Sequence, residues 1–146
     1  MEALRSTLAA KAAALAREAI ALDSTFAGAY RGLATALGNL GIDRLGRDSA
    51  LTRAYRYRDR LPERERLITT VDYFYQGPGQ DRRRAAAAFA ALHALDSTNA
   101  GVLNNYGILL NQLREFARAE ALLRRSLALR PSPNAGMNIV NAQLGQ

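Results

Sequence analysis

A short motif that recurs along the chain constrains the fold more than any other feature of the sequence. The pentapeptide ALDST occupies residues 21–25 and again 94–98, and the related ALRPS occupies 128–132. The second and third copies lie 34 residues apart, and the first two are separated by two such periods plus five residues. A period of this length indicates structural repeats, each of which buries its apolar face by stacking on the next.

The composition predicts that these repeats are made of helices. Of the 146 residues, 29 are Ala, 22 are Leu and 19 are Arg, whereas Val and Ile together supply eight. Ala, Leu and Arg favour helices, and the β-branched residues that favour strands are scarce. We therefore expect an all-α fold with eight helices, at about 3–22, 27–40, 48–61, 63–76, 81–95, 100–113, 116–129 and 134–144. Asp48-Ser49 and Asp81 are the expected N-caps.

Large apolar and small side chains recur at fixed positions of the repeat. Repeats starting at Ala27, Glu65, Ala100 and Asn134 need four extra residues around 42–47 and one around 77–80, which we expect in loops. Where the second helix of each pair packs closest to its neighbour, the frame places a small residue: Ala12, Ala50, Ala85 and Ala119. With these features the chain resembles the tetratricopeptide repeat (TPR) family over nearly its whole length. The resemblance implies a right-handed α-solenoid of antiparallel helix pairs.

The frame predicts a single TPR-like domain whose last repeat is truncated. The expected repeat parts are about 1–26, 27–64, 65–99, 100–133 and 134–146. In the last part, Val140 and Leu144 have no second helix to cover them. We therefore expect a fragment of a longer array, or a homo-oligomer that forms through the truncated C-terminal repeat.

Residues typical of catalytic centres are scarce. The chain has no Cys and one His, His93, and no Ser or Cys stands near that His in the sequence. No strand precedes the Gly77-Pro78-Gly79 turn and no Lys-Ser/Thr follows it, as a phosphate-binding loop requires. We expect a protein that is not an enzyme and binds no metal or cofactor. No run of 18 apolar residues or signal peptide is evident, so we expect no membrane segment in this chain and favour a cytoplasmic location, with an exported domain of a larger membrane protein as the alternative.

The family resemblance implies that a concave groove, lined by the first helix of each pair, binds a protein or peptide partner. In this sequence the groove positions are Arg31, Thr35, Asn39, Arg66, Thr69, Tyr73, Asn104, Asn105, Ile108, Asn111 and Asn138. The Asn-rich row is the most specific of these features. Asn carries a donor and an acceptor, as the backbone amides of an extended peptide do, although Asn also simply tolerates a polar helix face.

A basic middle region offers a different function. The net charge is +7, and residues 44–84 hold eleven Arg against six acidic residues. Basic and aromatic residues alternate over 53–60, as in proteins that bind single-stranded nucleic acid. Solvated Arg side chains on a helix explain the same pattern, so we expect nucleic-acid or polyanion binding only as the alternative function.

A second, shorter resemblance concerns residues 61–67, LPERERL. This segment is similar to a degenerate repeat in the TPR regions attached to bacterial serine/threonine kinases, adenylate cyclases and transcriptional regulators. The resemblance implies a docking or sensing region of a larger bacterial signalling protein.

Overall fold

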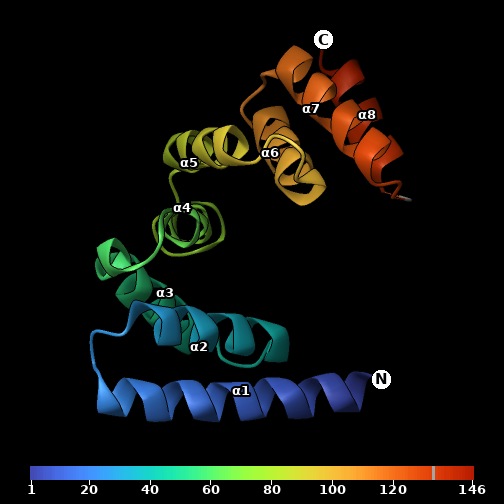
Figure 1. The fold of residues 1–146 in the computed structure, drawn as a ribbon. Helices are drawn as coiled ribbons and strands as arrows, with labels where there is room; N and C mark the ends of the chain where they lie inside the picture. The colour runs from blue at the N-terminus through green and yellow to red at the C-terminus, as the bar shows by residue number, and fades with distance from the viewer. Residues whose placement is uncertain (133) are drawn as a thin grey trace. The chain divides into compact units, whose positions relative to one another are not determined.

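The computed structural model describes residues 1–132 and 134–146, and this part of the chain is helical, without a strand (Figure 1). Its α-helices are α1 (Glu2–Leu22), α2 (Ala27–Leu40), α3 (Arg44–Arg56), α4 (Glu63–Val71), α5 (Arg82–Leu95), α6 (Ala100–Gln112), α7 (Phe116–Leu129) and α8 (Ala135–Leu144). A 3-10 turn, η1 (Arg58–Arg60), follows α3, and a π-helical turn, η2 (Asp72–Gln76), extends α4. The predicted all-α class is confirmed.

The described residues form two compact units, 1–80 and 81–146. The first holds α1 to η2 and the second holds α5 to α8. The division into five repeat parts stays a prediction, and its boundary at residue 133 lies outside the described residues.

The predicted helix positions agree with the structure except around the third helix. There the N-cap is Asp43, whose carboxylate accepts a 2.7 Å hydrogen bond from the Gly46 backbone N–H, so the expected Asp48-Ser49 cap is wrong. Residues 44–47, which the frame assigned to an inserted loop, form the first turn of α3 instead, because Asp43 satisfies a free N–H at an earlier position. Asp81 is the N-cap of α5 as predicted, accepting from the Arg84 N–H at 3.0 Å.

The repeated pentapeptide folds into the same turn in both units. The Asp23 carboxylate accepts hydrogen bonds from the backbone N–H and the hydroxyl of Thr25, at 2.9 and 2.7 Å. Asp96 accepts the same two bonds from Thr98, at 3.1 and 2.9 Å. Each Asp ends its helix in an extended conformation. The hydrogen bonds from Thr25 lower the pKa of Asp23.

Small side chains fill the helix contacts of the first unit. Ala9, Ala13 and Ala16 are the buried residues of α1, which packs against α2. The repeat frame predicts Ala12 as the small residue at the closest helix contact. This prediction is wrong, because Ala12 is exposed. Between α2 and α3, Ala34, Ala50 and Leu51 form a buried cluster. The prediction that Ala50 lies at a close helix contact is therefore confirmed.

Aromatic rings hold α3 against η2. The rings of Tyr55 and Tyr73 stack with centroids 4.2 Å apart and an angle of 4° between their planes. Phe74 meets both rings edge-on. A Cβ at Gly79 would lie 2.6 Å from the Tyr73 ring, so the turn after η2 packs directly on the cluster and requires Gly there.

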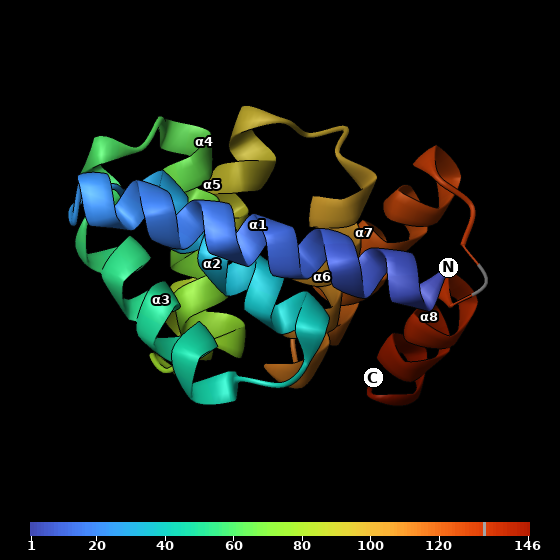
Figure 2. The same ribbon diagram turned by 90° about the horizontal axis from the view of Figure 1, so that it is seen from below.

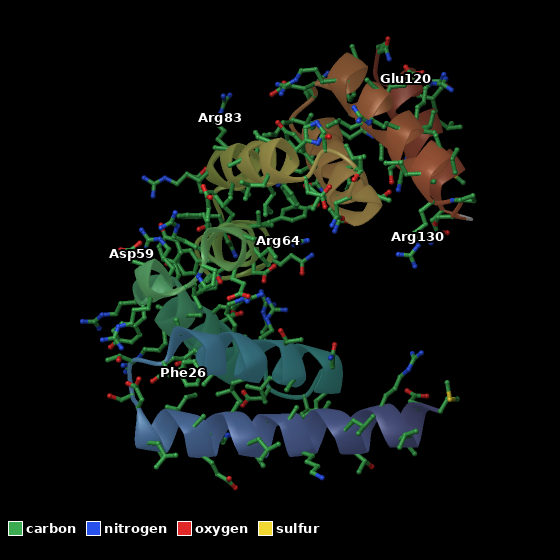
Figure 3. All side chains as sticks on the ribbon, viewed as in Figure 1. Phe26, Asp59, Arg64, Arg83, Glu120 and Arg130 are labelled. Carbon is green, nitrogen blue, oxygen red and sulfur yellow. The ribbon has the colours of Figure 1, made fainter. Side chains whose placement is uncertain are left out.

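In the second unit α6 and α7 run antiparallel. The Ser126 hydroxyl near the end of α7 accordingly donates a 2.8 Å hydrogen bond to the carbonyl of Ala100 at the start of α6. Ala85 and Ala119 are fully buried, as the frame predicts. Helix α8 packs on α7 through Ala135, Ile139 and Ala142, which are all buried. Glu120, labelled in Figure 3, accepts a 3.0 Å hydrogen bond from Gln143 of α8 and a 2.8 Å hydrogen bond from Gln146, which follows that helix.

The two apolar residues that the frame left without a partner helix, Val140 and Leu144, lie on the surface of α8. Both are exposed, as is Met137. Their exposure follows from the position of α7, which covers only the opposite face of α8.

Candidate functional site

A groove of about 930 Å³ lies between α1 and α2. Three of the residues predicted to line a binding groove, Arg31, Thr35 and Asn39, lie here on successive turns of α2. Helix α1 supplies the opposite wall, where Arg5 and Leu8 are exposed. The groove is open and combines two guanidinium groups, a hydroxyl, an amide and an apolar edge.

Sequence reasoning missed the contribution of α1 to this site. The repeat frame treated the first helix only as a packing element and assigned no ligand contacts to Arg5 or Leu8. The signal was present in the spacing along the helix, because Arg5 precedes the buried Ala9 by four residues and so lies one turn away on the same side of α1. Arg5 therefore lies at the edge of the buried face, next to α2.

Arg31 also belongs to a group of charges inside the first unit. The guanidinium groups of Arg31 and Arg47 interact electrostatically with the carboxyl group of Asp72, which lies in η2. Burial raises the pKa of Asp72 above its ordinary value, and the two Arg charges offset part of that rise. Arg47 donates a hydrogen bond to the carbonyl of Gln76 and an ion pair joins it to Asp48 at 3.3 Å. The Nε of Arg31 is buried and has no hydrogen-bond partner.

The groove residues predicted on α4 and η2 differ in their surroundings. Thr69 is fully buried, and its hydroxyl donates a 2.8 Å hydrogen bond to the carbonyl of Glu65 in its own helix. Its assignment to a binding surface is therefore wrong. Tyr73 is half-buried and stacks on Tyr55, and Arg66 is half-buried on α4.

The Asn-rich row of the second unit is brought together as predicted, but its members bind one another. The Asn138 amide donates to Asn104 Oδ1 at 3.4 Å, between residues one repeat period apart, and Asn111 donates to the carbonyl of Asn138 at 3.4 Å. Asn104 also donates to Asn105 Oδ1 at 3.2 Å. These bonds join α6 to α8, which gives the Asn residues a structural role.

Two features leave the row accessible to a ligand. Asn105 is exposed and Ile108 is half-buried on the same helix. Asn104 lines a second, smaller pocket of about 300 Å³, together with Ser126 and Arg130 of the same unit.

Three of the four Arg side chains in residues 53–60 make contacts within their own unit. The Arg58 guanidinium lies 3.9 Å from the centroid of the Tyr55 ring, and that of Arg56 lies 5.7 Å from the centroid of the Tyr57 ring. Arg60 forms a 3.8 Å ion pair with Asp23 of the first ALDST turn. The alternation of basic and aromatic residues is therefore used within the fold, in cation–π contacts and an ion pair.

Residues 1–132 and 134–146 contain no group of three or more His, Asp or Glu placed to hold a metal ion. Within the same residues, no helix combines the length and the apolar character needed to cross a membrane. His93 is half-buried on α5, and its Nδ1 is buried without a hydrogen-bond partner.

No protein-family model and no curated protein aligns significantly with this chain.

Proposed function

We propose that the chain is a non-catalytic interaction scaffold that binds a peptide or a helical segment in the groove between α1 and α2. The observation that carries the proposal is that Arg31, Thr35 and Asn39, which the sequence predicts as binding residues, line the groove of about 930 Å³ between α1 and α2. Binding sites are commonly concave surfaces that combine apolar area with a few convergent polar groups.

The proposal includes a TPR-like α-solenoid architecture. It is supported by the two ALDST turns with the same hydrogen bonds, and by the antiparallel pairing of α6 and α7 at the spacing that the repeat frame requires. It is also supported by Asn104 and Asn138, which occupy the same repeat position and contact one another. In such repeats each helix pair stacks on the next and leaves a long surface for a partner.

The lining of the groove suggests the chemistry of its ligand. Arg5 and Arg31 supply positive charge from opposite walls, and Leu8 supplies apolar surface. Guanidinium groups bind carboxylates through paired hydrogen bonds. We therefore propose a peptide that carries an acidic side chain next to an apolar one.

The similarity of residues 61–67 to repeats of bacterial signalling proteins supports a more specific setting. The proposed role there is a docking or sensing region of a larger signalling protein. The same groove would hold the partner segment, so this setting requires no additional site.

A selection from a random peptide library on the immobilised protein tests the proposal. We expect enriched peptides with acidic and apolar residues, and we expect Arg5→Gln and Asn39→Ala each to weaken their binding, by about tenfold for Arg5→Gln because a charge-assisted hydrogen bond is lost. Both side chains are exposed, so neither change disturbs the core. Arg53→Gln on α3, also exposed and outside the groove, is the matched control.

The steepness of the salt effect and a requirement for Arg53 distinguish polyanion binding from this function. If the enriched peptides bind equally to all variants, or if none is enriched, the groove is not the site. Tight binding of a single-stranded oligonucleotide that falls steeply with salt and depends on Arg53 would instead support the polyanion alternative.

A further inference from the structure

Helix α1 has apolar side chains on two different faces. One face, with Ala9, Ala13 and Ala16, packs against α2. The other face carries four leucines whose side chains are largely exposed: Leu4 at 59%, Leu8 at 58%, Leu15 at 56% and Leu22 at 91%. In Figure 2 α1 lies in front of the other helices of its unit, and in Figure 3 side chains project from it on the side away from α2.

The exposed leucines follow the spacing of a coiled-coil seam. Leu8, Leu15 and Leu22 are seven residues apart, and a second set with the same spacing, Leu4, Lys11 and Glu18, alternates with them. This pattern is a heptad with Leu at every a position and Leu, Lys and Glu at d. An apolar stripe on a helix normally packs against another element, whereas α2 covers only one of the two apolar faces of α1.

The two charged residues of the seam determine which orientation of a second α1 helix fits. In a parallel pair, Lys11 would face Lys11 and Glu18 would face Glu18, so like charges would meet. In an antiparallel pair, Leu4 faces Leu22 of the second copy. Lys11 faces Leu15 of the second copy, and Glu18 of that copy lies one helical turn further along. Each pair of helices then makes two symmetric Lys–Glu ion pairs, which favours the antiparallel arrangement.

We propose that the chain forms a homodimer in which the outer faces of two α1 helices pair antiparallel about a two-fold axis between Lys11 and Leu15. A two-fold contact uses the same patch on both copies, and in that orientation the series Leu–Leu–Lys–Leu–Glu–Leu places Leu4 opposite Leu22, Leu8 opposite Glu18 and Lys11 opposite Leu15 of the second copy. This surface is distinct from the exposed face of α8. It shares Leu8 with the edge of the groove between α1 and α2, and the inference does not depend on the proposed groove function.

Two features of α1 reduce the cost of this association. Helix α1 is already held in shape by α2, so pairing requires no helix formation. The residues beside the seam on its solvent side, Ala14 and Ala21, are small and exposed, which lets two helices approach closely.

The molar mass of the full chain, measured by sedimentation equilibrium over a range of concentrations, tests the dimer. We expect wild-type protein to dimerise with rising concentration and the Leu15→Gln/Leu22→Gln variant to stay monomeric. Leu144→Gln, which changes an exposed leucine of α8, is the control and should dimerise like wild type. A chain that is monomeric throughout, or a dimer lost in the α8 variant but kept in the α1 variant, would overturn the proposal.

Charge exchange tests the orientation without altering apolar surface. Lys11→Glu alone and Glu18→Lys alone should each weaken the dimer, because both ion pairs become like-charge contacts. An equimolar mixture of the two variants should dimerise again, since the Glu residues of one copy then meet the Lys residues of the other. Single variants that dimerise as well as wild type would exclude the antiparallel register.

Cross-linking tests the register directly, because the chain has no cysteine of its own. Ala14 lies closest to the proposed axis, so Ala14→Cys should form a disulfide between copies on mild oxidation. Thr7 lies opposite Ala21 of the second copy, so Thr7→Cys should cross-link poorly. Equal cross-linking at both positions is expected of a parallel pair and would contradict the proposal.

Discussion

Gly107 in α6 lies directly against Leu123 in α7: a Cβ added at Gly107 would stand 2.7 Å from Leu123 Cγ and 2.9 Å from its Cδ2. Both residues are buried, and Leu123 is fully so. The same Cβ would also lie 3.3 Å from the carbonyl oxygen of Ala119. The distance between these two helices is thus set by a missing side chain on one and a small side chain on the other.

Replacing Gly107 with Ala should therefore destabilise the second unit. The added methyl group would displace Leu123 or separate the helices, at a cost of about 1–3 kcal/mol, which exceeds the gain of about 1 kcal/mol in helix propensity. Thermal unfolding followed by circular dichroism measures the change. Gly136→Ala in α8, where a Cβ meets nothing within 4 Å, is the control and should be neutral or stabilising.

Ala119→Leu is expected to act at the same contact from the other helix. Ala119 is fully buried, so a larger side chain should cost roughly 1–3 kcal/mol through overpacking. Chemical denaturation provides the measurement. Ala121→Leu, at an exposed position of the same helix, should leave the unfolding midpoint nearly unchanged. Equal midpoints for the two variants would contradict the assigned role of Ala119.

Glycine at position 114 should make the chain more stable than alanine there. Arg114 has a φ of 64°, and Gly41, which the predicted frame places at the equivalent position, ends α2 with a φ of 68°. A left-handed conformation costs a residue with a Cβ about 1 kcal/mol, and glycine adopts it freely. We expect Arg114→Gly to raise the melting temperature relative to Arg114→Ala, which removes the same charge but keeps the Cβ. The reverse order would show that backbone strain is not the deciding factor.

The contribution of Asp72 to stability should become less favourable as the pH rises, whereas that of a salt-bridged carboxylate becomes more favourable. Its pKa is raised in the folded state by burial, so the folded chain holds its proton more tightly than the unfolded chain. The ionised group therefore costs stability above its folded pKa, and the cost disappears below the unfolded value of about 3.9.

It follows that Asp72→Asn should raise the melting temperature near neutral pH and that its advantage should shrink as the pH falls toward that value. Melting curves at several pH values measure the difference. Asp59→Asn, at an exposed position of η1, is the control. A stabilising effect that is the same at every pH would mean that ionisation of Asp72 is not its cause.

The positions of the helices could be predicted from the sequence because the signals are local. Helix propensity, the cap at Asp81 and the two ALDST turns all act within a few residues, and the observed helix ends agree with them. The exception at Asp43 has the same origin, because the sequence offers two acidic caps a few residues apart and the earlier one is used.

The candidate site could be predicted only in part. The repeat frame placed Arg31, Thr35 and Asn39 on one face of α2, and all three line the groove. It failed at Thr69, which lies in the α-helical part of α4 and is fully buried, because the covered face of α4 depends on the elements that pack against it and not on the spacing within the helix.

The sequence by itself therefore determined which segments are helical, where they turn and which residues are small enough for close contact. Only the tertiary structure decided which faces are covered: that α2 buries Ala13 and not Ala12, that Arg5 and Arg31 line the same groove, and that the Asn residues of α6 and α8 bind one another. The reason is physical, since backbone hydrogen bonds and caps are made between near neighbours in the chain, whereas the burial of a face depends on a helix that the local sequence does not specify.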